Sequence, residues 1–381
     1  MDKHTITVTG YGANGDGVAR LSDGKVVFIR GAARGDTLEV QLTEVQPKSA
    51  RAAIVKRITP SPHRIRPDCR FYPECGGCDF RHITYAEELD AKLRRVNDAL
   101  ERIGKQSINV SEILTTGQVD GYRNKVVLHS DGTSLGYYRS GSHDIVPIDR
   151  CLLLKEDLNE AIRGLSPRET ATLRSGSSES TPPLEEELDG LVFGITGFFQ
   201  VNTSAALLLF RKAREYAALS KNETLIDLYC GVGTLTLFAG RDVGRAIGVE
   251  KNPDAVKAAL ENARRNGLPF IEFINADAAN WDSGQISPDC IIVDPPRKGL
   301  SKSVIRKIHS LSPKRIVYIS CDPATLARDL RLLEPYTVKE ISAIDMFPRT
   351  ANIETCCLLS ARHASSLFLT EKTECGISSP L

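Results

Sequence analysis

The chain has 381 residues, of which 41% are hydrophobic and 25% charged, and its formal net charge is +1. This composition excludes collagen-like and wholly disordered chains, and the small net charge means that any nucleic-acid contact must be local. No apolar run approaches the roughly 20 residues of a membrane span, and the first residues show no signal-peptide pattern. We therefore expect a cytoplasmic protein with no membrane partner.

Residues 1–58 contain short runs of alternating apolar and polar residues, separated by glycine-containing turns such as 10–12 and 15–17. Strands so short and so closely spaced predict a small antiparallel barrel. Between Gln46 and Arg70 there are seven Lys or Arg residues and one acid. Such a patch beside a barrel favours binding of nucleic-acid phosphates, although a solvated surface with no ligand is the alternative interpretation.

Residues 59–195 form the next predicted domain, which is rich in proline and cysteine at its start. Residues 85–103 keep one face apolar at helical spacing, so we predict a helix that packs on the following domain. Residues 121–154 return to strand-like patterns, and the polar segment 165–183 is predicted to be a surface loop.

Ten cysteines in a reducing compartment need an explanation other than disulfides. Cys69, Cys75 and Cys78 follow a C-x5-C-x2-C spacing, which is typical of metal ligands. Such a set, completed by a fourth thiolate, suits either zinc or a [4Fe–4S] cluster, and the spacing does not separate the two.

Residues 196–362 alternate between strand and helix patterns, which predicts a doubly wound α/β domain. Predicted strands end at Tyr229, Glu250, Asn275, Val293 and Ser320. The polar residues 363–381 lack periodicity and are predicted to be a loosely ordered tail.

A glycine turn follows the first of these strands. Gly231 and Gly233 allow the backbone to turn sharply and approach a ligand, while Thr236 stands where a dinucleotide fingerprint has its third glycine. Glu250 and Asp277 close the next two strands, where carboxylates can bind a ribose and an adenine edge. The pattern favours an adenosine-type ligand without a phosphate, S-adenosylmethionine more than NAD.

Two further features lie on the same expected edge. Asp294-Pro-Pro-Arg297 predicts a rigid substrate loop, and Arg297 replaces the aromatic residue that exocyclic-amine methylation requires. Cys321 follows a strand and precedes a helix N-terminus, which can lower a thiol pKa, so we predict a catalytic nucleophile rather than a core cysteine. Glu354 could face Cys321 across the cleft or be a surface acid.

Taken together, the motifs resemble those of the S-adenosylmethionine-dependent RNA uracil-5-methyltransferases that carry a TRAM barrel and an iron–sulfur cluster. The motifs are Gly-Asp-Gly-Val-Ala-Arg (15–20), the cysteine motif (69–78), Gly-Tyr-Arg-Asn-Lys (121–125), Phe-Phe-Gln-Val-Asn (198–202), Asp-Leu-Tyr-Cys-Gly-Val-Gly-Thr (227–234), Asp-Pro-Pro-Arg (294–297) and Ser-Cys-Asp-Pro (320–323). The resemblance implies a Rossmann-like class I methyltransferase domain, an OB-like TRAM barrel and a β-rich central domain with the cysteine cluster.

The resemblance also implies roles for residues. Cys321 matches the nucleophile that adds to C6 of uracil, and Glu354 matches the base that removes the C5 proton. Cys151 matches the fourth cluster ligand, and the family favours iron–sulfur over zinc. The family's cofactor and substrate-pocket positions are matched by Gln200, Tyr229, Thr234, Glu250, Asp277 and Asp294. The chain departs from the family at Arg81, Arg349 and Asn352.

We therefore expect methylation of C5 of a uridine in RNA, with 23S ribosomal RNA favoured over transfer RNA and a monomeric enzyme. An RNA cytosine-5-methyltransferase and a non-catalytic RNA-binding or assembly factor are the alternatives. Residues 297–331 hold nine Lys or Arg residues and two acids, and they predict a second phosphate track beside Cys321. Arg123 is an RNA-contact candidate by resemblance.

Overall fold

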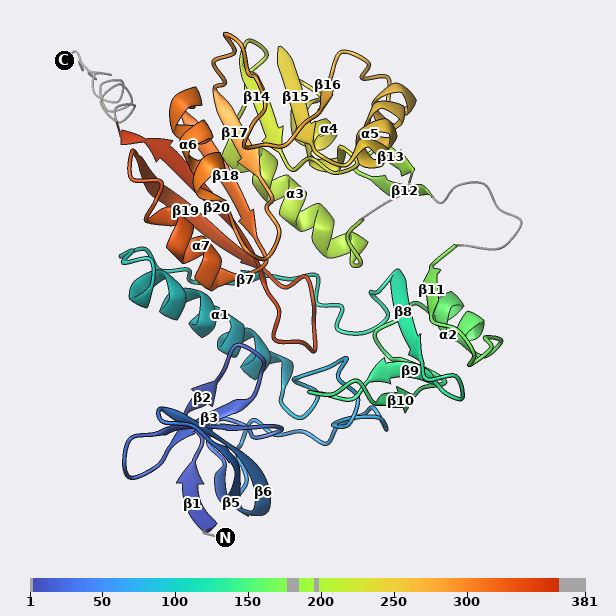
Figure 1. Ribbon diagram of the computed structural model, residues 1–381, viewed down its shortest axis with the longest axis vertical. Helices are drawn as coiled ribbons and strands as arrows, with labels where there is room; N and C mark the ends of the chain where they lie inside the picture. The colour runs from blue at the N-terminus through green and yellow to red at the C-terminus, as the bar shows by residue number, and fades with distance from the viewer. Residues whose placement is uncertain (1–2, 177–184, 195–198, 363–381) are drawn as a thin grey trace, which may run out of the picture.

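The computed structural model describes residues 3–176, 185–194 and 199–362. Figure 1 shows a small barrel at one end, a large α/β domain at the other, and a β-rich segment beside them. Helix α1 (Tyr85–Arg102) lies between the barrel and the α/β domain. The predicted tail, 363–381, lies outside the described residues.

The barrel is a six-stranded sheet in the order β1-β5-β6-β4-β3-β2. The strands are β1 (Lys3–Thr7), β2 (Gly10–Tyr11), β3 (Gly17–Arg20), β4 (Val26–Ile29), β5 (Thr37–Val45) and β6 (Ser49–Thr59). The backbone N–H of Thr9 donates to the carbonyl of Val18 at 2.8 Å and that of Val8 to the carbonyl of Asp36 at 2.9 Å, which joins the two ends of the sheet.

Strand β3 begins where the glycines predicted only a turn. A Cβ atom at Gly17 would lie 2.7 Å from the Cβ of Ala32, closer than real side chains approach. Gly17 is therefore needed because β3 passes directly over Ala32, and not because the chain turns there.

The β-rich segment contains a four-stranded sheet in the order β10-β9-β8-β11. Its elements are β8 (Lys125–Ser130), β9 (Leu135–Tyr138), β10 (Ile145–Pro147), α2 (Glu156–Ile162) and β11 (Ala171–Arg174). The short strand β7 (Ile113–Leu114) joins the sheet of the α/β domain, and the hairpin of β12 (Glu185–Leu188) and β13 (Leu191–Gly194) packs on the core of that domain. The prediction of a surface loop over 165–183 is wrong at β11, which pairs with β8 from Ala171 opposite Leu128 onward. Residues 177–183 of that prediction lie outside the described residues.

The α/β domain contains an eight-stranded sheet in the order β16-β15-β14-β17-β18-β20-β19-β7. Strand β20 runs antiparallel to its neighbours, and the other pairings are parallel. The elements are α3 (Thr203–Ala217), β14 (Thr224–Leu228), α4 (Thr234–Gly240), β15 (Arg245–Glu250), α5 (Pro253–Arg265), β16 (Glu272–Asn275), β17 (Cys290–Val293), α6 (Lys302–Leu311), β18 (Arg315–Ser320), α7 (Pro323–Leu330), β19 (Tyr336–Ile344) and β20 (Glu354–Ala361).

Helices cover both faces of this sheet, as expected of a doubly wound domain. Residues of α3 and α4 form one core with the sheet, and α6 and α7 form the other. Val96 and Leu100 of α1 belong to the second core, so this helix packs on the α/β domain. Within the described ranges, none of the helices has the length and apolarity needed to cross a membrane.

Candidate active site and cysteine pocket

Three parallel strands bring the predicted site residues to one edge of the sheet. Leu228 of β14 pairs with Val293 of β17, and Val293 pairs with Tyr318 of β18. Because these strands end almost level, the residues that follow them meet at their carboxyl ends. The glycine turn, Asp294 and Cys321 therefore share one rim.

The glycine turn is shaped by its contacts with β15 and β16. Gly233 has φ 81° at the N-cap of α4, and a Cβ there would lie 2.8 Å from the ring of Phe273. The backbone N–H of Gly231 donates to Oε2 of Glu250 at 3.2 Å. Tyr229 has φ 70°, a left-handed conformation that is uncommon for a residue with a side chain.

Asp227 lies beneath this turn and is almost fully buried. The hydroxyl of Thr236 donates to its Oδ2 at 2.6 Å, so Thr236, at the third-glycine position, holds this carboxyl in place. Burial raises the pKa of Asp227 to about 7. The same cause raises the pKa of Asp294 to about 7.

A pocket opens between the turn and Asp294. Its lining includes five of the predicted binding residues, namely Gln200, Tyr229, Gly231, Thr234 and Asp294. Glu250 adjoins it through the bond to Gly231. Asp277 is exposed at the end of β16 and does not line the pocket, although its charge helps to raise the pKa of Tyr229. Phe199 and Phe210, which were not predicted, supply an apolar wall.

Cys321 and Glu354 lie opposite each other on neighbouring strands. Ser320 of β18 pairs with Thr355 of β20 in an antiparallel ladder. Cys321 is one residue beyond this pair and Glu354 one residue before it, so the ladder places them side by side. Burial raises the pKa of Glu354 well above its ordinary value, and the neighbouring Asp294 adds to the effect.

The expectation that the helix N-terminus lowers the pKa of Cys321 is wrong. Burial, followed by the charge of Glu354, raises that pKa to about 11, and Arg297 acts in the opposite direction. The N-terminus of α7 is already capped, because Asp322 accepts the N–H of Thr325 at 2.8 Å. The protein without its ligands therefore holds Cys321 as a thiol.

Helix α1 positions the loop that precedes Glu354. The Nζ of Lys92 donates at 2.7 Å both to Glu88 and to Asp345, and all three side chains are buried. Arg95 donates to the carbonyl of Ala351 at 2.8 Å. The sequence showed these residues only as the charged face of an amphipathic helix, so it did not reveal that part of this face is buried against the catalytic loop.

The prediction of a continuous basic track from Arg297 to Arg331 is wrong in part. Arg315 begins β18 and Cys321 follows its end, which puts about 20 Å between them at the rise of a strand. Arg315 also pairs with Glu223, and Lys314 pairs with Asp289. Arg297 and Lys298 are exposed on the loop beside the rim.

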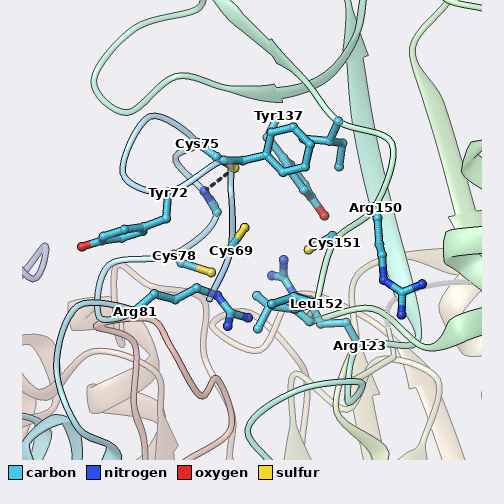
Figure 2. A pocket seen from close by; sticks show the side chains of 14 residues that line it. Cys69, Tyr72, Cys75, Cys78, Arg81, Arg123, Tyr137, Arg150, Cys151 and Leu152 are labelled. Atoms are coloured by element: carbon cyan, nitrogen blue, oxygen red, sulfur yellow. Dashed lines mark hydrogen bonds between the residues drawn. The ribbon is translucent and has the colours of Figure 1, made fainter. Parts of the chain in front are cut away.

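The four predicted cluster ligands line one pocket, which is formed by residues 69–81, Arg123, Tyr137 of β9 and residues 148–153. Figure 2 shows the side chains of Cys69, Cys75, Cys78 and Cys151 pointing toward one another. In the described part of the chain, no group of three or more His, Cys, Asp or Glu residues meets the geometry for holding a metal ion. The backbone of Cys151 is fixed by Asn159, whose Oδ1 accepts its N–H at 2.8 Å.

Three polar atoms of this pocket are buried without a hydrogen-bond partner. They are the Nε of Arg81, the Nε of Arg123 and the hydroxyl of Tyr137. Arg123, the RNA-contact candidate, is half-buried and its side chain lies beside the cysteines (Figure 2). Its contact with RNA stays a prediction. Buried donors without partners are uncommon and indicate an acceptor that belongs in the pocket.

Comparisons with known proteins agree with this architecture. Residues 3–55 match the family model described as TRAM domain, 200–314 match Methyltransferase small domain, and 281–362 match tRNA (Uracil-5-)-methyltransferase. An uncharacterized RNA methyltransferase of Caldanaerobacter subterraneus is 32% identical over 94% of this chain and 98% of its own length. One of Nostoc sp. is 33% identical over 93% and 95%.

The chain belongs to the RNA uracil-5-methyltransferase family. The crystal structure of the Pyrococcus abyssi tRNA (uracil-54, C5)-methyltransferase in complex with S-adenosyl-L-homocysteine superposes with a TM-score of 0.73. That protein is 25% identical over 93% of this chain and 99% of its own. The predictions of an RNA uracil-5-methyltransferase, a TRAM domain and a class I methyltransferase fold are confirmed.

Proposed function

We propose that this uracil-5-methyltransferase modifies its target uridine through a covalent bond between the sulfur of Cys321 and C6 of the base, with S-adenosylmethionine as methyl donor. The observation that carries the proposal is the strand register that sets Cys321 beside Glu354 on the rim of the Asp294 pocket. A nucleophile and a buried base at adjacent positions are what an addition–elimination reaction requires.

The reaction begins when the thiol of Cys321 loses its proton to solvent and the thiolate adds to C6 of uracil. The electrons of the C5–C6 double bond move toward C5 and O4. C5 would then take the methyl group from the bound donor, whose carbon–sulfur bond breaks to leave a neutral thioether. Glu354 removes the C5 proton, the double bond reforms and the thiolate leaves. The raised pKa of Glu354 makes its ionised form a stronger base for this last proton transfer.

The donor pocket fits a sulfonium ligand. Among its lining residues are two carboxyls, two hydroxyls, the amide of Gln200 and the thiol of Cys230, and none of the lining side chains is cationic. The two carboxyls, Asp227 and Asp294, have pKa values near 7. A cation bound near them favours their ionised forms. The Pyrococcus abyssi enzyme holds S-adenosyl-L-homocysteine in its crystal structure. When bound, the donor supplies the methyl group, and Glu250 lies where a ribose would be held.

We also propose that Cys69, Cys75, Cys78 and Cys151 bind a [4Fe–4S] cluster. The four side chains face one pocket without meeting the geometry for a metal ion. A polynuclear cluster suits this spread, because each thiolate binds a different iron. The three donors without partners around the pocket also suit the sulfur atoms of such a cluster.

The cluster's proposed role is structural. Arg123, beside the pocket, forms a β-bridge with Asn202 at the start of α3. The side chain of the next residue, Asn124, donates to the carbonyl of Gln200 in the donor pocket at 3.1 Å. Loading the cluster thus fixes a segment that reaches the catalytic domain.

We propose 23S ribosomal RNA as the substrate, from the likeness of the cysteine motif and barrel to that branch of the family. Transfer RNA is the second candidate, because the Pyrococcus abyssi enzyme, which shares the whole fold, acts on uridine 54 of tRNA. Mapping 5-methyluridine in ribosomal and transfer RNA from a deletion strain decides between them. A monomeric state and a cytoplasmic location stay predictions.

The test of the mechanism is a covalent adduct that survives denaturation. RNA with 5-fluorouridine, incubated with the enzyme and S-adenosylmethionine, should trap the protein, because fluorine cannot leave as a proton does. Cys321→Ala should abolish the adduct, whereas Cys290→Ala, at the other end of β17, should keep it. An adduct only with 5-fluorocytidine would select cytosine methylation, and no adduct with either RNA would favour a non-catalytic factor.

A further inference from the structure

Arg123 differs from the other arginines of the cysteine pocket. Arg81 pairs with Asp68 and Asp120, and Arg150 pairs with Glu156 at 2.7 Å. The ionisable groups that act most strongly on Arg123 are all phenols and thiols, namely Tyr122, Tyr137, Cys151 and Cys78. Its Nε is buried, and the N–H donates to no acceptor.

The backbone holds this guanidinium in the pocket. The N–H of Arg123 donates to the carbonyl of Leu153 at 2.8 Å, and its own carbonyl accepts the N–H of Lys155 at 3.1 Å. Arg123 is thus fixed to the loop that begins with Cys151. In Figure 2 its side chain lies beside Cys151 at the side of the pocket where Arg81 also enters.

The side chain of Arg123 is half-buried, but its Nε is fully buried and has no hydrogen-bond partner. This arrangement is unfavourable, because a charged group that is partly removed from water needs a compensating charge or acceptor. Neutral thiols do not supply one. Four thiolates around an iron–sulfur core carry a net negative charge. Such a cluster supplies the anion that Arg123 lacks.

We propose that Arg123 is the charge-compensating residue of the cysteine pocket and that Tyr137 is its neutral helper. The guanidinium would offset the negative charge of the bound cluster, and the Nε of Arg123 and the hydroxyl of Tyr137 would supply it with hydrogen-bond donors. The inference rests on the cluster of the proposed function. Arg123 is a positioning residue here, because it acts on the cluster and not on the RNA or the methyl donor.

Two measurable properties follow. A nearby positive charge stabilises the reduced cluster more than the oxidised one, so Arg123 raises the reduction potential. Arg123 also slows the loss of iron, because partners outside the ligand shell typically contribute roughly 10- to 100-fold to metal affinity. In the apoprotein, Arg123 should instead lower the thermal stability of the protein, since the guanidinium then has no anion.

The experiment compares four full-length proteins purified without air: the wild type, Arg123→Met, Arg123→Lys and Arg150→Met. Arg150 lines the same pocket but is paired and about half exposed, so it is the matched control for charge removal. Iron content, the rate of iron loss to a chelator, the reduction potential of the visible absorption band, and thermal unfolding before and after cluster removal are measured.

Arg123→Met should lose iron about tenfold faster or more, with a more negative potential, while its apoprotein unfolds at an equal or higher temperature than wild-type apoprotein. Arg123→Lys should restore most of the potential, and Arg150→Met should match the wild type. Equal potentials and iron loss in Arg123→Met and Arg150→Met overturn the role of Arg123 but leave the cluster. A wild type with zinc or no metal overturns both, and the 5-fluorouridine adduct still reports on catalysis independently.

Discussion

Cysteine occurs in two opposite electrostatic settings in this protein. On the rim of the α/β domain, burial raises the pKa of Cys321, and the charges of Glu354 and Asp294 add to this rise. In the cysteine pocket, burial also raises the pKa of Cys78 and Cys151, but the guanidiniums of Arg81 and Arg123 act in the opposite direction. The two settings therefore differ in the sign of the neighbouring charges, since anions favour the thiol and cations favour the thiolate.

The difference teaches how one residue type serves two kinds of chemistry. A thiolate that must bind metal permanently is stabilised by fixed positive charge. A nucleophile that must leave its adduct after each turnover is kept as a thiol until the reaction needs it. Four substitutions test this contrast, and each changes one charge or one sulfur.

Glu354→Gln should have the largest effect. The amide cannot accept the C5 proton, so methylation should fall by about 10²- to 10⁴-fold and the covalent RNA complex should accumulate on unmodified substrate. The rate of 5-methyluridine formation and the denatured gel shift measure these two effects. Glu340→Gln, on the exposed part of β19, is the matched control. Normal turnover in Glu354→Gln would assign the base elsewhere.

Cys78→Ser should act on stability and not directly on chemistry. Cys78 is the most buried of the four ligands. Its replacement should prevent the cluster from binding and lower the thermal unfolding midpoint by on the order of 10 °C. Iron analysis and calorimetry measure this loss. Cys290→Ser, at a cysteine buried inside β17, should keep its iron. Full iron content in Cys78→Ser would contradict the assignment of the ligands.

Asp294→Asn should change how stability depends on pH. The pKa of Asp294 is raised in the folded protein from 3.8 to about 7. Its contribution to the free energy of unfolding is therefore fully present below pH 3.8 and is lost as the pH rises through about 7. The free energy of unfolding of the Asn variant should therefore rise relative to that of the wild type toward pH 8, by at most roughly 4 kcal/mol. Denaturant unfolding at pH 4 and pH 8 measures the difference. A constant difference across this range would count against the raised pKa.

Arg297→Met should have the smallest effect, on the thiol itself. Arg297 lowers the pKa of Cys321, so its removal should move the midpoint of Cys321 alkylation further above about 11. Reaction with iodoacetamide against pH, with Cys321→Ala as the blank, measures this shift. Lys298→Met changes the next exposed residue and should leave the midpoint in place. An unchanged midpoint would show that the charge of Arg297 does not act on Cys321.

Strongly patterned elements were predictable from the sequence. Strands β17 and β18 end at Val293 and Ser320, as predicted, because continuous apolar residues mark these strands. Strand β11 and helix α2 were not predicted. The short β11, with its Thr and Arg residues, has little hydrophobic signal, and its pairing with β8 decides its structure.

The chemistry of the glycine turn and of the cysteine motif could be inferred from neighbouring residues, because their ligating groups lie within a few positions of one another. Contacts between distant segments could not. The register that sets Cys321 beside Glu354, and the bond from Lys92 to Asp345 across 253 positions, arise only when the sheet and α1 assemble. The raised pKa of Cys321 is likewise a result of burial and of charges from several strands, which no local pattern of residues records.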